Sequence, residues 1–203
     1  MRFSTTVAAA AVAGGALAKD INVSVGKSGL KFEPAEITAA EGDNIYFKFW
    51  PKNHSVAQAA FAKPCEPLEG GLWSGFVPTT DTAKAAELTY MFTVTNASAP
   101  IWFYCTQGQH CQNGMVGVIN PPYNNNNRTL QAFTEAAAQA RQNVSPTSTA
   151  GEGGMLMNGT DHSTTPTSSG SATSGSPTGA ASSLQVNSLA FSGVFGMLAY
   201  LVL

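Results

Sequence analysis

The chain has 203 residues, a formal net charge of −2 and only 11% charged residues. It contains no basic run, so the composition gives no support for binding to nucleic acid. It contains three cysteines, and a secreted chain with an odd number of cysteines must leave one thiol outside its internal disulfides.

The first residues predict a secretory signal peptide. Arg2 supplies a positive start, residues 7–13 form an apolar run too short to span a bilayer, and Ala16-Leu17-Ala18 is a small-x-small cleavage site. We therefore expect residues 1–18 to be removed after Ala18. The alternative, a buried N-terminal helix, is disfavoured because Gly14-Gly15 would break it near its end.

Residues 19–122 are predicted to form one all-β domain. Residues 45, 47 and 49 are apolar and alternate with Tyr46, Lys48 and Trp50, and residues 41–44 (Glu-Gly-Asp-Asn) read as a turn. Several short strands separated by turn signals favour an antiparallel sandwich or barrel. The expected strands are 21–25, 36–39, 44–50, 55–57, 88–94, 101–105 and 116–119.

A set of metal-binding residue types lies at the end of this domain. Within "IWFYCTQGQHCQNGMVGVIN", the spacing from Cys105 is Cys-x4-His110-Cys111-x3-Met115. Upstream, "PKNHSV" places His54 after a turn and at the start of an expected strand. One Cys, two His and a weak axial Met are the ligands of blue-copper electron-transfer sites. The soft thiolate and thioether suit Cu(I), whereas imidazole accepts both oxidation states.

Each of these residues also has an ordinary structural interpretation. A buried Cys is usually a small hydrophobic residue and a Met usually fills a gap in the core. His54 alone would be a turn residue. Cys105 could pair with Cys111 or with Cys65, which would give a sandwich without a metal. We favour copper because all four residues of the ligand set are present.

The segment after the domain changes composition. Residues 123–144 form a linker in which a helix over 127–142 would place Leu130, Phe133, Ala137 and Ala140 on one face. Residues 145–183 are mostly Ser, Thr, Gly, Pro and Ala, which cannot bury enough apolar surface to offset the entropy lost on ordering. We expect a disordered, O-glycosylated stalk there.

The C-terminal residues, 184–203, predict a signal for a glycosylphosphatidylinositol (GPI) anchor. Residues 189–203 are almost wholly apolar and short for a membrane span, and a polar spacer and small residues precede them. Gly179 is the expected attachment site, and Ser176 and Ala180 are the alternatives. A retained tail anchor is the alternative, which Gly193 and Gly196 disfavour.

Six Asn-x-Ser/Thr sequons occur in the chain. Such sequons suit surface loops of secreted proteins. Asn53 adjoins the candidate ligand His54, so we expect it to stay unmodified. We expect glycans at the other five: Asn22, Asn96, Asn127, Asn143 and Asn158.

Two stretches resemble the cupredoxins over roughly residues 21–120. "FYCTQGQHCQNGMVGVIN" resembles their ligand loop, with a His-Cys pair similar to that of the phytocyanin branch, and "LKFEPAEITAAEGDNIYFKFWPKNHSVAQAAF" resembles their early strands and first-ligand turn. The resemblance implies a Greek-key cupredoxin fold that holds one type 1 (blue) copper ion. His54, Cys105 and His110 would be the strong ligands, and Met115 the axial ligand.

The same resemblance implies further roles for residues near the ligands. In phytocyanins the cysteine after the second histidine is disulfide-bonded, which here implies a Cys65–Cys111 bond and leaves Cys105 as the free thiolate. The N–H of Ser55 is the expected donor to the Cys105 sulfur. Tyr104 is a candidate for an electron path to the surface, or merely an alternating strand residue.

Two features depart from the phytocyanin pattern. The axial position holds Met, where many phytocyanins have Gln. Residues 66–82, with "GGLWSGF", have no counterpart that we can align, and would rim or cover the metal.

The signal peptide, stalk and tail together resemble the fungal extracellular serine-rich proteins. We therefore expect a monomer on the outer face of the plasma membrane or in the cell wall, attached through a GPI lipid or to wall glucan. The expected activity is one-electron transfer with an unnamed redox partner. The alternatives are a protein that only holds copper, and a structural module of the cell surface. Catalysis is not expected, because three histidines are too few for a multicopper oxidase and four protein ligands leave no open position.

Overall fold

A computed structural model describes residues 17–125 and 127–159. Nearly all of the predicted signal peptide, most of the predicted stalk with the expected attachment site Gly179, and the whole C-terminal signal lie outside the described residues.

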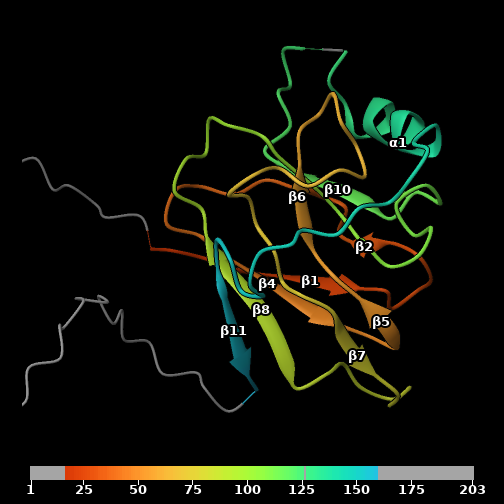
Figure 1. Cartoon of the computed structure of the whole chain (residues 1–203). Coiled ribbons are helices and arrows are strands. Elements are labelled where there is room, and N and C mark those ends of the chain that lie inside the picture. Colours follow the sequence, from red (N-terminus) through yellow and green to blue (C-terminus); the bar gives the residue numbers. More distant parts are fainter. Residues whose placement is uncertain (1–16, 126, 160–203) are drawn as a thin grey trace, which may run out of the picture. The chain divides into compact units, whose positions relative to one another are not determined.

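Two main sheets form the sandwich that the sequence predicts (Figure 1). The first sheet has the strand order β11-β8-β4-β1-β2, the second has the order β3-β10-β9-β6, and β5 pairs with β7 in a small third sheet. The strands are β1 Asp20–Val25, β2 Phe32–Glu33, β3 Glu36–Ile37, β4 Asn44–Phe49, β5 Lys52–His54, β6 Ala57–Ala59, β7 Val77–Thr79, β8 Leu88–Thr93, β9 Ile101–Tyr104, β10 Val116–Ile119 and β11 Met155–Asn158.

The core between the two main sheets follows from the alternation in β4. Ile45, Phe47 and Phe49 are fully buried, whereas Lys48 is exposed. The Phe47 ring meets Phe103 of the opposite sheet edge-on, with centroids 5.4 Å apart. Because inward side chains recur every second residue, this one strand fixes which face of its sheet is buried.

Two strand pairs are parallel, a departure from the antiparallel sandwich predicted. These pairs are β1 with β4 and β3 with β10. The chain leaves β1 through β2 and crosses to the second sheet as β3 before it returns as β4. Such a crossover brings a strand back in the same direction, whereas a tight hairpin reverses it.

The strand boundaries differ most around the first candidate ligand. The predicted strand 55–57 is wrong, because β5 ends at His54 and β6 begins only at Ala57. None of the predicted strands covers β2, β5, β7 or β11. The first three are very short, and β7 contains Pro78, which argues against a strand when read from sequence alone.

The stalk boundary predicted at residue 145 is also wrong. Residues 155–158 pair with β8 in the register Met155↔Met91 to Asn158↔Leu88, and β11 lies beside β8 (Figure 1). The Tyr90 hydroxyl donates to the Glu152 carbonyl at 2.6 Å. The folded domain therefore continues to Asn158, because a short apolar stretch within a Gly-rich segment adds a strand to the edge of the sheet.

The single helix in the described residues, α1 (Leu130–Ala138), packs on the domain. Thr129 caps it by accepting the Ala132 N–H, as Ser and Thr commonly do at this position. Phe133 and Ala137 are buried, and the Phe133 ring lies 4.9 Å from Trp102, centroid to centroid. The predicted apolar face is confirmed for Leu130, Phe133 and Ala137, but the helix is shorter than the predicted 127–142 and ends before Ala140. Because its apolar face packs on the sheet residues, α1 belongs to the domain.

Over residues 17–125 and 127–159, no helix is long and apolar enough to cross a membrane.

Candidate metal centre

His54, Cys105 and His110 come together at one end of the sandwich. Their candidate ligand atoms all lie within 4.8 Å of one another. The Cys105 Sγ lies 3.4 Å from His110 Nδ1 and 3.9 Å from His54 Nδ1. With metal–ligand bonds of roughly 2.0–2.3 Å, as for zinc, one ion can bridge donors at such separations.

The loop that carries Cys105 and His110 is closed by backbone hydrogen bonds. Cys105 follows β9, and its N–H donates to the Met115 carbonyl at 3.1 Å. The Met115 N–H donates to the His110 carbonyl at 2.9 Å. Met115 directly precedes β10 and is fully buried in the same core cluster as Cys105. The two strands and these bonds thus hold three of the four candidate ligands on one short loop.

His54 is held by residues 66–82, the segment with no counterpart in the phytocyanin pattern. It is the last residue of β5, not the first of a strand, and it lies opposite Val77 in the β5–β7 pair. The segment 66–82 therefore supplies the strand that fixes the chain direction at His54.

Gly26 approaches the other side of the His54 ring. It adopts φ +79, and a Cβ built on it would lie 2.2 Å from His54 Nε2. Only glycine fits there, since both the backbone conformation and the close approach exclude a side chain. This role cannot be read from the sequence, because Gly26 looks like an ordinary turn glycine.

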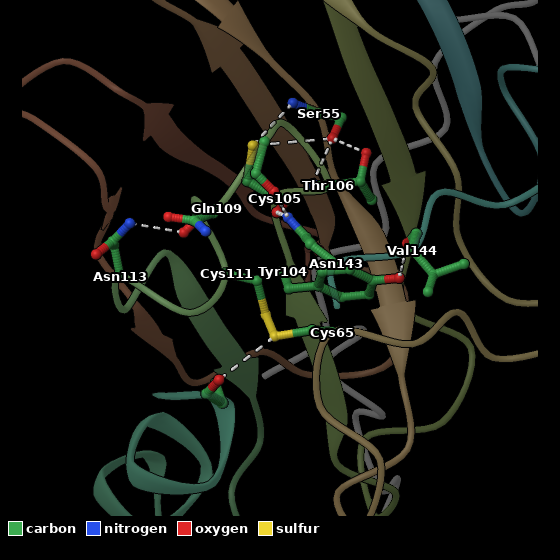
Figure 2. Close-up of a disulfide and its surroundings, with 12 residues drawn as sticks. Ser55, Cys65, Tyr104, Cys105, Thr106, Gln109, Cys111, Asn113, Asn143 and Val144 are labelled. Atoms are coloured by element: carbon green, nitrogen blue, oxygen red, sulfur yellow. Dashed lines mark hydrogen bonds between the residues drawn. A yellow bond between two sulfur atoms is a disulfide. The ribbon is translucent and has the colours of Figure 1, made fainter. Parts of the chain in front are cut away.

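Two polar groups of Ser55 contact the Cys105 sulfur (Figure 2). Its N–H donates to Cys105 Sγ at 3.4 Å, as predicted, and its Oγ lies 3.8 Å from the same sulfur. The Ser55 Oγ also accepts the Thr106 N–H and pairs with the Thr106 hydroxyl, both at 2.9 Å. Because Ser55 directly follows His54, these hydrogen bonds hold the Cys105 sulfur close to the first histidine ligand.

Burial shifts the titration of the candidate ligands. Burial raises the pKa of the Cys105 thiol. Hydrogen bonds from the backbone amides of Gln107 and Ser55 and from the Ser55 hydroxyl lower it by less. Burial also lowers the pKa of His110. The pKa of His54 is lowered mainly by burial and, to a smaller extent, by repulsion from His110. The histidines are therefore held in the neutral form that binds metals. A metal ion would deprotonate the thiol outright.

The three cysteines divide as the resemblance implies. Cys65 and Cys111 form a disulfide with an S–S distance of 2.06 Å, and Cys105 is free and buried (Figure 2). The disulfide takes Cys111 away from its near neighbour Cys105. The one thiol left over is thus the one that faces both histidines.

The Tyr104 side chain does not itself reach the surface, and its role in an electron path stays a prediction. Its side chain is fully buried, and its hydroxyl donates to the Val144 carbonyl at 2.6 Å. Burial, followed by repulsion from Glu66, raises the pKa of the phenol. Tyr104 connects the ligand strand to the segment after α1, a contact that no sequence pattern indicated.

The sequons divide into exposed and engaged asparagines. The side-chain nitrogen of Asn53 donates to Gln107 Oε1 at 2.9 Å, which agrees with the expectation that it stays unmodified. Asn143 is half-buried, and its side-chain nitrogen donates to two carbonyls of the ligand loop. The glycan predicted at Asn143 would compete with these two hydrogen bonds. The other four predicted sites are exposed: Asn22, Asn96, Asn127 and Asn158.

A cavity of about 460 Å³ lies beside the two histidines. Lys27, Lys52, His54 and His110 are among its lining residues. His54 is only 3% exposed, whereas His110 is half-buried. The cavity therefore opens the centre to solvent on the side of His110.

A curated relative decides which family the chain belongs to. The protein named "Probable GPI-anchored cupredoxin-1" from Arthroderma benhamiae is 36% identical over 200 residues, which cover 98% of this chain and 94% of that protein. The chain belongs to the cupredoxin family. A second protein from the same organism, named "Extracellular serine-rich protein", is 36% identical over 72% of this chain and 56% of its own length.

Solved cupredoxin structures are also similar to this chain. A pseudoazurin from Sinorhizobium is 23% identical over 50% of this chain and 72% of its own, with a TM-score of 0.34. A mutant amicyanin with Cu(I) is 19% identical over 49% and 79% of the two chains, with a TM-score of 0.36. No family model matches the sequence.

The donor set of this cupredoxin fits copper. It combines one thiolate, two imidazoles and a buried thioether in one place, which is the set that type 1 copper sites use. Cys105 is also protected from disulfide formation, as a thiolate ligand must be.

Proposed function

We propose that the protein is a cell-surface type 1 copper protein that carries single electrons, with His54, Cys105 and His110 as strong ligands and Met115 as the axial ligand. The observation that carries this proposal is the one free, buried thiol, whose sulfur lies 3.4 and 3.9 Å from the Nδ1 atoms of two neutral histidines. Copper bound there supplies a one-electron couple between Cu(I) and Cu(II).

The residues around the centre keep its geometry constant during electron transfer. The β5–β7 pair and Gly26 fix His54 from two sides. The Ser55 N–H donates to the Cys105 sulfur and thereby stabilises the thiolate. The disulfide ties the ligand loop, through Cys111, to the segment that follows His54. A centre held in this way needs little rearrangement when its charge changes.

The electron path that we propose runs through the His110 ring. This ring is the more exposed of the two imidazoles, and it borders the 460 Å³ cavity with Lys27 and Lys52. The two lysines favour a redox partner with acidic groups at its docking surface, which would make the association rate fall as salt is added.

Catalysis at the centre is not part of this proposal. Four protein ligands would fill the coordination positions, so a substrate would find no open site on the metal.

We propose the outer face of the plasma membrane or the cell wall as the location. The relative named as a GPI-anchored cupredoxin matches over 98% of this chain, and the apolar residues 189–203 fit the same processing.

Phosphatidylinositol-specific phospholipase should release the protein from cells, unless it has been transferred covalently to the wall. Recovery of peptides from residue 189 onward in the mature protein would show a retained anchor instead.

Voltammetry of the copper-loaded protein tests the electron-carrier role. We expect one reversible one-electron wave, and electron exchange with an anionic mediator that slows as salt rises. Lys52→Gln should weaken this salt dependence, whereas Lys84→Gln, away from the cavity, should not change it. Tight copper binding without a reversible wave would favour a protein that only holds copper.

A further inference from the structure

The segment between α1 and β11 crosses the metal end of the domain. We call residues 140–154 the strap. Its Val144 N–H donates to the Cys65 carbonyl at 2.9 Å, and its Val144 carbonyl accepts the Tyr104 hydroxyl. Further along, the Gly151 N–H donates to the Trp73 carbonyl, and the Trp73 N–H donates back to Glu152. The strap is thus bonded to the residue before Cys105, to the disulfide and to the edge of the sheet.

Asn143 is the strap residue that contacts the ligand loop itself. Its Nδ2 donates to the Cys105 carbonyl and to the Gly108 carbonyl, both at 3.0 Å. Figure 2 shows the Asn143 side chain pointing at the backbone of Cys105. Two carbonyl acceptors fix the orientation of the amide, because only the nitrogen can donate. The Asn143 Oδ1 is buried and accepts no hydrogen bond, so the contacts depend on the nitrogen alone.

These bonds complete the support of Cys105. The Cys105 N–H is already held by the Met115 carbonyl, and Asn143 holds the carbonyl on the other side of the same residue. With both peptide groups fixed, the direction of the Cys105 side chain toward His54 and His110 is fixed too. The bond to Gly108 holds the exposed tip of the loop in the same way.

We propose that Asn143 is a positioning residue for the Cys105 ligand, and that folding closes its Asn-Val-Ser sequon to glycosylation. The part that concerns copper rests on the proposed function. A glycan would be joined to the Nδ2 atom and would replace one of its two hydrogens. One of the two hydrogen bonds would then be lost, and the sugar would have to lie against the ligand loop. A chain glycosylated at Asn143 therefore could not keep both hydrogen bonds between the strap and the ligand loop.

The test uses the full-length chain expressed in a secreting eukaryotic host, with two variants. Asn143→Leu is similar in size and uncharged but donates no hydrogen bond. Ser145→Ala is the matched control, because it destroys the sequon and leaves Asn143 in place. Each protein is examined with Cu(II) by visible absorption, electron paramagnetic resonance and potentiometry. Hydrogen exchange of residues 105–113 is measured on the copper-free forms.

We expect Asn143→Leu to shift the thiolate-to-copper band, the copper hyperfine splitting and the reduction potential, while Ser145→Ala matches the unaltered protein. In the copper-free state, exchange of residues 105–113 should be on the order of tens of times faster in Asn143→Leu, because each of the two lost hydrogen bonds is worth a factor of about two to ten. A role in stability alone would lower the melting temperature and leave the three copper signals unchanged, and that result would overturn the positioning role.

Glycopeptide mapping of the unaltered protein needs no variant. We expect Asn143 to be unmodified in the secreted protein, and a glycan on most molecules there would overturn the proposal. If the unaltered protein gives no blue species, the proposed function fails, but loop exchange and glycan occupancy still decide whether Asn143 holds the loop.

Discussion

At the scale of single residues, Gly26 is the most sensitive position beside the centre. Gly26→Ala would place a methyl group against the His54 ring, so the ring must move. Gly29→Ala is the control, since Gly29 also has a positive φ, +98, but a Cβ there meets nothing within 4 Å. Both variants should lose roughly 1–2 kcal/mol of stability from backbone strain. Only Gly26→Ala should lose copper affinity in a chelator competition, and equal affinities would contradict the account.

The two histidines should make the copper-free protein sensitive to acid. Burial lowers the pKa of His54 and His110 in the folded protein below the ordinary value of 6.5. Below pH 6.5 the unfolded chain therefore binds more protons than the folded one. The free energy of unfolding then decreases as the pH is lowered. The loss stops growing once the pH is below the folded-state pKa values.

Denaturant unfolding of the copper-free protein between pH 7.5 and 5 measures this loss. His110→Gln should show a shallower decrease than the unaltered protein, because one of the two groups has been removed. An identical pH profile for the two proteins would show that the acid sensitivity has another origin.

At the scale of elements, the disulfide closes a long loop between the two halves of the site. Cys65 and Cys111 are 46 residues apart. In the chain-entropy model, a loop of this size constrains the unfolded chain by about 4 kcal/mol. Cys65→Ala/Cys111→Ala should lose stability of this order in denaturant titrations and keep its colour. Cys65→Ala alone should also lose colour over time, because Cys111 can then pair with Cys105. Stable colour in the single variant would count against that competition.

Helix α1 is expected to be part of the folding unit. Phe133 is fully buried between Trp102 and Phe61, with ring centroids 4.9 and 5.9 Å away. Phe133→Ala should therefore destabilise the domain by about 3–5 kcal/mol. Gln131→Ala, on the exposed face of the same helix, should change the free energy of unfolding by less than about 0.5 kcal/mol. Equal effects in thermal unfolding would mean that α1 is dispensable.

At the scale of the whole molecule, the sequence determined the parts that depend on local pattern. The alternation through Ile45, Phe47 and Phe49 predicts the buried face of β4, and the spacing from Cys105 to Met115 predicts a compact ligand loop. The apolar face of α1 was also predictable, since Phe133 and Ala137 recur at helical spacing. The cysteine pairing required the family resemblance, because spacing alone left three pairings open.

The features that the sequence did not predict depend on contacts distant in the chain. Asn143 carries the pattern of a glycosylation site, and nothing local shows that the ligand loop takes its amide. β11 lies in a segment of stalk-like composition and is a strand only because β8 offers it an edge. Gly26 and the strand β7 matter through His54, which lies 28 residues after Gly26 and 23 residues before Val77. Such partners become visible only when the chain is folded.

The visible absorption spectrum of the Cu(II)-loaded protein tests the central claim most directly. The account predicts an intense blue or green band from charge transfer between the Cys105 thiolate and copper, at a stoichiometry of one ion per chain. Cys105→Ser should abolish the band, and Cys65→Ala/Cys111→Ala should retain it. A protein that stays colourless with one equivalent of Cu(II), or whose colour survives Cys105→Ser, would contradict a copper centre built on His54, Cys105, His110 and Met115.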